Sequence, residues 1–141
     1  MTRRAGIALA LAMLCGQARA AQVCSMEEMA SSQAGAAAAR DWDAMYDAYH
    51  RFSPCDRGGV AQAFTDSIGY LLSRRWDSLY DLEHFAEANP TFRAFVLRHI
   101  DTTMDEKDLR RIHAYAKECP GYARPICREI ESRARAALAD Q

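Results

Sequence analysis

Apolar residues recur at intervals of three or four along most of the chain, which is the spacing of one face of an α-helix. The first clear stripe consists of Trp42, Met45, Tyr46, Tyr49 and Phe52. Later stripes begin at Val60, Leu79, Phe92, Leu109 and Ile126. No segment alternates like a strand for more than a few residues, so the pattern predicts an all-α fold.

Capping signals divide this pattern into short helices. Residues 31–40 are rich in alanine and fit either a helix or a loose connection. Ser53-Pro54 and Cys119-Pro120-Gly121 are expected to end helices. Expected helix starts are Ser25 with Glu28, Asp56, Asp77, Asn89 with Pro90, and Thr103 with Glu106. We expect about six short helices, arranged as stacked helical hairpins or as an orthogonal bundle.

The first 20 residues have the order of a secretory signal. Arg3 and Arg4 precede an apolar run, and small residues stand at Ala18 and Ala20. The run is too short to span a bilayer, which needs about 20 residues. We therefore expect residues 1–20 to be a signal peptide cleaved near Ala20. Residues 21–141 would then form one helical domain in the periplasm or outside the cell, with no membrane-spanning segment.

Cleavage at this point also makes the cysteine count even. The chain has five cysteines, and removal of Cys15 leaves four in the expected mature protein. In an oxidising compartment four cysteines indicate two disulfides, for which three pairings exist. Cys24–Cys55 and Cys119–Cys127 are favoured because each pair is nearest in sequence and brackets one helix junction.

The charge balance argues against some ligands. Loss of Arg3, Arg4 and Arg19 with the signal changes the net charge from −1 to −4. Because nucleic-acid affinity depends on an excess of basic residues, nucleic acid is not expected as a partner.

Few residues have the spacing that catalysis or metal binding requires. None of the four histidines is part of an H-x-x-x-H or H-E-x-x-H motif, and no cofactor motif is present. We therefore predict no metal and no cofactor. One alternative is a small hydrolase or metal-dependent enzyme that uses His99, Asp101 and Asp66.

Two surfaces are candidate binding sites for a protein partner. Trp42 and Tyr46 lie one helical turn apart, and although core positions are favoured for both, they would form a binding ridge if exposed. The other surface is an acidic helical stripe, usually a solvated face but also suited to a basic partner. Its residues are Asp77, Asp81, His84 and Glu87.

An ordered pattern between residues 42 and 130 resembles a family of small, exported, largely uncharacterised helical proteins of Gram-negative bacteria. The pattern is Phe52-x-x-Cys55-Asp56-x-Gly58, Phe64-x-Asp66-Ser67, Leu71-Leu72, Trp76, Phe95-Val96-Leu97-x-His99-Ile100-Asp101-x-Thr103, Cys119-Pro120 and Cys127. In size, compartment and fold the chain is also loosely similar to periplasmic immunity proteins of type VI secretion.

These observations favour an exported, non-enzymatic protein-binding domain, with an immunity-type inhibitor of a secreted toxin as its most concrete form. The partner would be a toxin or a cell-wall hydrolase. An alternative is a structural or stress-related envelope protein that acts by self-association, for instance as a homodimer.

Overall fold

The computed structural model describes residues 23–141, which contain seven α-helices, three short 3-10 helices and no strand. This confirms the all-α prediction, with one α-helix more than the six expected. The expected signal peptide, residues 1–20, lies outside the described residues. The α-helices are α1 Met26–Ala38, α2 Trp42–Phe52, α3 Gly59–Arg74, α4 Leu79–Ala88, α5 Pro90–Arg98, α6 Glu106–Lys117 and α7 Arg124–Ala139. The 3-10 helices are η1 Ser53–Cys55, η2 Trp76–Ser78 and η3 Gly121–Ala123.

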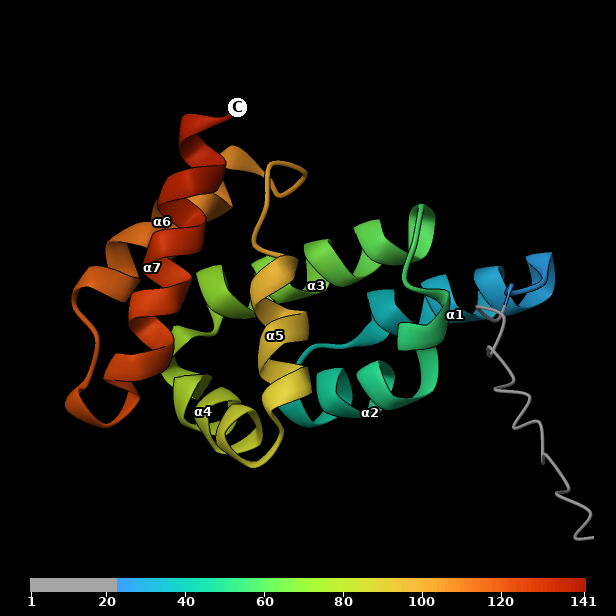
Figure 1. The fold of residues 1–141 in the computed structure, drawn as a ribbon, viewed down its shortest axis with the longest axis horizontal. Helices are drawn as coiled ribbons and strands as arrows, with labels where there is room; N and C mark the ends of the chain where they lie inside the picture. The colour runs from blue at the N-terminus through green and yellow to red at the C-terminus, as the bar shows by residue number, and fades with distance from the viewer. Residues whose placement is uncertain (1–22) are drawn as a thin grey trace, which may run out of the picture.

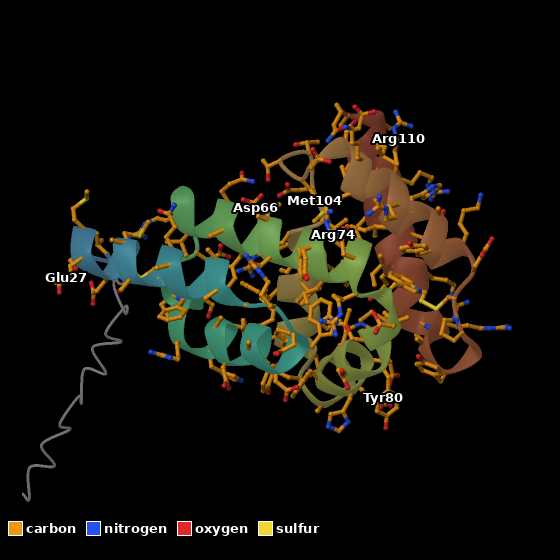
Figure 2. The ribbon with its side chains drawn as sticks, turned by 180° about the vertical axis from the view of Figure 1, so that it is seen from behind. Glu27, Asp66, Arg74, Tyr80, Met104 and Arg110 are labelled. Atoms are coloured by element: carbon orange, nitrogen blue, oxygen red, sulfur yellow. A yellow bond between two sulfur atoms is a disulfide. The ribbon has the colours of Figure 1, made fainter. Side chains whose placement is uncertain are left out.

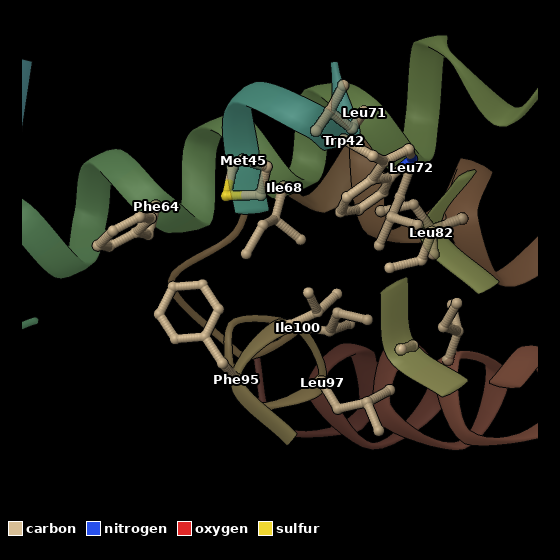
Figure 3. Packing of buried hydrophobic residues seen from close by; sticks show 14 of the residues in the cluster. Trp42, Met45, Phe64, Ile68, Leu71, Leu72, Leu82, Phe95, Leu97 and Ile100 are labelled. Carbon is tan, nitrogen blue, oxygen red and sulfur yellow. The ribbon is translucent and has the colours of Figure 1, made fainter. Parts of the chain in front are cut away.

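Helix α3 crosses the middle of the molecule (Figure 1). It packs against α1 at one end and against α6 at the other, while α6 and α7 pair as a hairpin. Its buried stripe of Phe64, Ile68, Leu71 and Leu72 is the one expected from the sequence. Figure 3 shows Phe95 of α5 opposite this stripe, and its ring meets the Phe64 ring edge-on at 4.8 Å between centroids.

Several helix starts follow the expected caps. Ser25 and Glu28 form the predicted capping box of α1, and the alanine-rich segment continues that helix to Ala38. Asn89 caps α5, whose first residue is Pro90. Local side-chain chemistry therefore determines these boundaries.

Three expected helix starts are wrong, each because a neighbouring residue takes the position. Asp77 lies inside η2, and Ser78 rather than Asp77 precedes α4. Gly58 rather than Asp56 precedes α3, and its φ of 53° favours glycine. Asp105 rather than Thr103 caps α6, accepting hydrogen bonds from the backbone of Lys107 and Asp108. Because the Asp56 side chain does not cap α3, it is available for the ion pair described below.

Both favoured disulfides are present. Cys24–Cys55 ties the segment before α1 to η1, with a Cα–Cα distance of 5.8 Å. Cys119–Cys127 joins the end of α6 to the first turns of α7 at 6.2 Å. Among the described helices, none is long and apolar enough to cross a membrane.

Candidate functional site

The two surfaces expected to bind a partner differ in their exposure to solvent. Asp77, Asp81, His84 and Glu87 are all exposed, on η2 and α4. Trp42, by contrast, is 1% exposed and belongs to the core. The expected core position of Trp42 is therefore confirmed, and the alternative of an exposed ridge with Tyr46 is wrong.

Tyr46 is half-buried for a clear reason. Its ring stacks on Phe85 at 4.6 Å and meets Phe92 edge-on at 4.9 Å between centroids. Its hydroxyl accepts a hydrogen bond from the Asn89 side chain at 3.2 Å. Tyr46 thus joins α2 to the α4–α5 turn, and its ring contacts are already made within the chain.

Other aromatic residues lie on the surface beside the acidic stripe. Tyr80, Tyr122 and Tyr115 are 63%, 53% and 40% exposed, and Trp76 is half-buried against the core. The rings form two pairs, Trp76 with Tyr115 at 5.6 Å and Tyr80 with Tyr122 at 6.0 Å between centroids. We call these four residues the aromatic face; Figure 2 shows Tyr80 at the molecular surface.

The aromatic face is held in place by separate parts of the fold. Trp76 belongs to η2 and Tyr80 to the first turn of α4, while Tyr115 lies in the last turn of α6 and Tyr122 in η3. Helix α4 packs against η3. The Cys119–Cys127 disulfide closes the turn that carries Tyr122. These constraints reduce the ordering cost of a contact made through the exposed rings.

Charged residues lie near the aromatic face. Asp43, Asp81 and His84 line a depression of about 410 Å³ together with Tyr80. A depression of about 300 Å³ beside the Cys119–Cys127 disulfide, which closes the turn that carries Tyr122, is lined by three basic side chains. They are Lys117, Arg124 and Arg128. An aromatic centre with a polar, charged rim is the usual composition of a protein–protein interface.

A second arrangement centres on His99, at the end of α5. His99 is buried, and its Nε2 lies 3.2 Å from Oδ2 of Asp56, which also accepts a hydrogen bond from Arg98. On the other edge of the ring, Nδ1 lies 3.0 Å from the Thr65 hydroxyl. Because a carboxylate only accepts hydrogen bonds, Nε2 carries a proton.

The electrostatics of this cluster keep Asp56 ionised. Burial alone would raise the pKa of Asp56, but hydrogen bonds and positive charge from His99 and Arg98 outweigh it and lower the pKa. Asp56 Oδ1 is buried without a hydrogen-bond partner among the described residues. The carboxylate therefore depends on its two partners, and it links η1 to α5 while His99 links α5 to α3.

The cluster orders a hydroxyl, an imidazole and a carboxylate as in nucleophilic hydrolases. Thr65, however, is only 1% exposed, so a substrate has little access to its oxygen. The residues expected around His99 do not converge on it. Asp101 lines a shallow depression together with His99, but its carboxylate accepts hydrogen bonds from Thr103. Asp66 is exposed on α3 and accepts a hydrogen bond from Gln62.

One feature of the sequence could have indicated the aromatic face. Tyr80 stands outside the apolar stripe that begins at Leu79, and an aromatic residue outside a buried stripe is a candidate contact residue. The Asp56 cluster had no such signal, because its members are far apart in sequence.

The comparisons give no functional information. No model of a known protein family, no curated protein and no solved structure matches this chain. Within residues 23–141, no three His, Cys, Asp or Glu side chains are grouped so that they could hold a metal ion.

Proposed function

We propose that this chain is an exported, non-enzymatic protein-binding domain that contacts its partner through the aromatic face. The observation that supports the proposal most is the pairing of Trp76 with Tyr115 and of Tyr80 with Tyr122 at a surface with charged margins. Tyrosine and tryptophan give large contact areas at a low cost in conformational entropy, which is why they are enriched at binding hot spots.

Export rests on the signal-like residues 1–20 and on the two disulfides. We expect the protein isolated from the periplasm to begin at Ala21. Under denaturing conditions it should react with a thiol-alkylating reagent only after reduction. Protein that retains residues 1–20, or that carries free thiols in the periplasm, would contradict this part of the proposal.

The partner that fits best is a secreted toxin or a cell-wall hydrolase, which the domain would inhibit as an immunity protein does. This choice rests on the resemblance in size, compartment and fold to periplasmic immunity proteins. The two charged margins are expected to orient the partner and to raise its association rate.

The test is capture of the partner by variants of the oxidised protein. The protein is immobilised, exposed to a periplasmic extract, and any bound protein is identified and its affinity then measured. Tyr80→Ser and Tyr122→Ser each remove an exposed ring, and a hot-spot loss of about 2 kcal/mol corresponds to roughly a 30-fold weaker affinity. Met26→Ser is the matched control, because Met26 is 88% exposed but lies on α1.

Two outcomes would overturn the proposal. Equal affinity of Tyr80→Ser, Tyr122→Ser and Met26→Ser for the captured protein would place the contact elsewhere. Capture of only further copies of this chain, with concentration-dependent dimers in sedimentation, would favour the self-associating envelope protein instead.

A further inference from the structure

A second surface, away from the aromatic face, runs along the exposed side of α3. Gln62, Asp66, Tyr70 and Arg74 follow one another at four-residue intervals and form its floor. They span about 18 Å at 1.5 Å per residue. Figure 2 shows Asp66 and Arg74 on this side of the molecule, with Tyr80 well separated from them.

Two segments form the walls of this α3 groove. Gln33 and Ala37 of α1, and Arg40 just after it, line one depression of about 360 Å³ together with Asp66 and Tyr70. Met104, Asp105 and Asp108 line an adjoining depression of about 450 Å³, which shares Asp66 and Tyr70 with the first. The two depressions therefore adjoin at Asp66 and Tyr70, in the middle of α3.

The polar side chains of the groove are held by one another. Gln62 Nε2 donates to Asp66 Oδ1 at 2.8 Å, and Arg74 donates to Asp108 at 3.1 Å. The Arg40 guanidinium lies over the Tyr70 ring at 5.3 Å. Because these contacts already restrict the side chains, a ligand loses less affinity in ordering them.

Three side chains on the floor of the groove keep polar atoms that make no hydrogen bond within the described part of the chain. Within the described residues, Asp66 Oδ2 and Gln62 Oε1 accept no hydrogen bond, and the Tyr70 hydroxyl makes none. Along α3, two acceptors are therefore followed by a group that both donates and accepts. Such a row suits ligand hydroxyls, which also donate and accept.

The charge of the groove restricts the class of ligand further. Two arginines and three aspartates line it, so their charges nearly cancel. A nucleic acid or an anionic lipid would require an excess of positive charge. A peptide would require a sheet edge or a series of apolar pockets, whereas Met104 and the Tyr70 ring are the main large apolar groups in the lining.

We propose that the α3 groove binds a neutral oligosaccharide through Gln62, Asp66 and Tyr70. Successive floor residues are four residues apart and advance about 6 Å along the helix axis, which is close to the length of one pyranose unit. Successive floor residues can therefore meet hydroxyls of successive sugar rings. This function is separate from the protein contact proposed above, because it uses other residues on another surface.

The test is a titration of the exported, oxidised protein with chitotetraose and with cellotetraose, followed by amide NMR. At least one of these sugars should shift amides of α3, the end of α1 and residues 103–108. Asp66→Ala should weaken that binding about tenfold or more, because it removes a charged acceptor. Asp47→Ala, an exposed aspartate on α2, is the matched control and should leave the affinity unchanged. Gln62→Ala gives an independent variant and should also weaken binding.

Three results would overturn the proposal. The first is no shift with either sugar at millimolar concentration. The second is equal affinity of the wild type, Asp66→Ala and Gln62→Ala. The third is tighter binding of an acidic tetrasaccharide than of both neutral ones. Tyr80→Ser should bind sugar as the wild type does, so failure here is distinguishable from failure of the protein-binding proposal.

Discussion

At the scale of single residues, Asp56 shows that a local sequence signal does not reveal contacts with residues that are distant in the sequence. An aspartate shortly before an amphipathic stripe is a reasonable helix cap, but Gly58 occupies that position. The true partners of Asp56 are Arg98 and His99, more than 40 residues later. A capping signal depends on four neighbouring residues, whereas a buried ion pair depends on the whole fold, so only the first can be predicted from sequence.

Substitution of Asp56 should be costly. Asp56→Asn removes the negative charge that pairs with Arg98 and His99, and loss of hydrogen bonds to a charged group typically costs about 2 kcal/mol of unfolding free energy. Asp47→Asn, which removes a carboxylate from an exposed site on α2, should change it by less than about 0.5 kcal/mol. Urea denaturation at pH 6 measures both. Equal stability of the two variants would show that the Asp56 cluster contributes little.

The difference in stability between the wild type and Asp56→Asn should depend on pH, and the sign of this dependence follows from the pKa of Asp56. Because the pKa of Asp56 is lowered by folding from its ordinary value of 3.8, its contribution is complete above that value. It is lost as pH falls through the lower pKa of the folded state. The stability difference between wild type and Asp56→Asn should therefore shrink as pH falls below 3.8. A difference that grows below pH 3.8 would contradict this assignment.

Gly58 offers a test of backbone conformation. Its φ of 53° and ψ of −128° lie in a region that side chains disfavour, so Gly58→Ala should cost about 1–3 kcal/mol. An added Cβ would meet no atom within 4 Å, so the expected loss comes from backbone strain alone. Gly121→Ala is the control, because it has equal space and no positive φ, and it should be nearly neutral. Thermal unfolding compares them, and equal melting temperatures would refute the strain argument.

At the scale of elements, hydrophobic spacing predicted most of the helices. The α2 stripe from Trp42 to Phe52 and the α5 start at Asn89-Pro90 agree with the structure, because burial and capping act within one or two turns. The alanine-rich segment could not be assigned, because alanine favours a helix without marking a buried face. Its helical form depends on packing against α3.

The two disulfides should differ in what they stabilise. The chain-entropy model gives about 3.7 kcal/mol for the longer Cys24–Cys55 loop and about 2.6 kcal/mol for Cys119–Cys127. Replacing both cysteines of the first pair by alanine should therefore destabilise the protein more. Replacing the second pair should weaken partner binding more, because that bond closes the turn that carries Tyr122. Denaturation and affinity measurements on the same two variants test this prediction. It would be contradicted if one variant were both the less stable and the weaker binder.

At the scale of the whole molecule, the sequence predicted the fold class and the disulfides but not the surfaces that the fold assembles. The acidic stripe on α4 was visible as a helical pattern. The aromatic face was not, because Trp76 meets Tyr115 and Tyr80 meets Tyr122 only after α4 packs against the α6–α7 turn. The α3 groove depends in the same way on walls from α1 and from residues 103–108.

The central claim is that the aromatic face binds another protein. Its most direct measurement is photo-crosslinking in cells with p-benzoylphenylalanine placed at Tyr80, at Tyr122 and, as a control, at the exposed Met26. We expect one and the same heterologous protein to be crosslinked from Tyr80 and Tyr122, and not from Met26. Absence of a crosslinked protein at both tyrosines, or the same product at Met26, would contradict it.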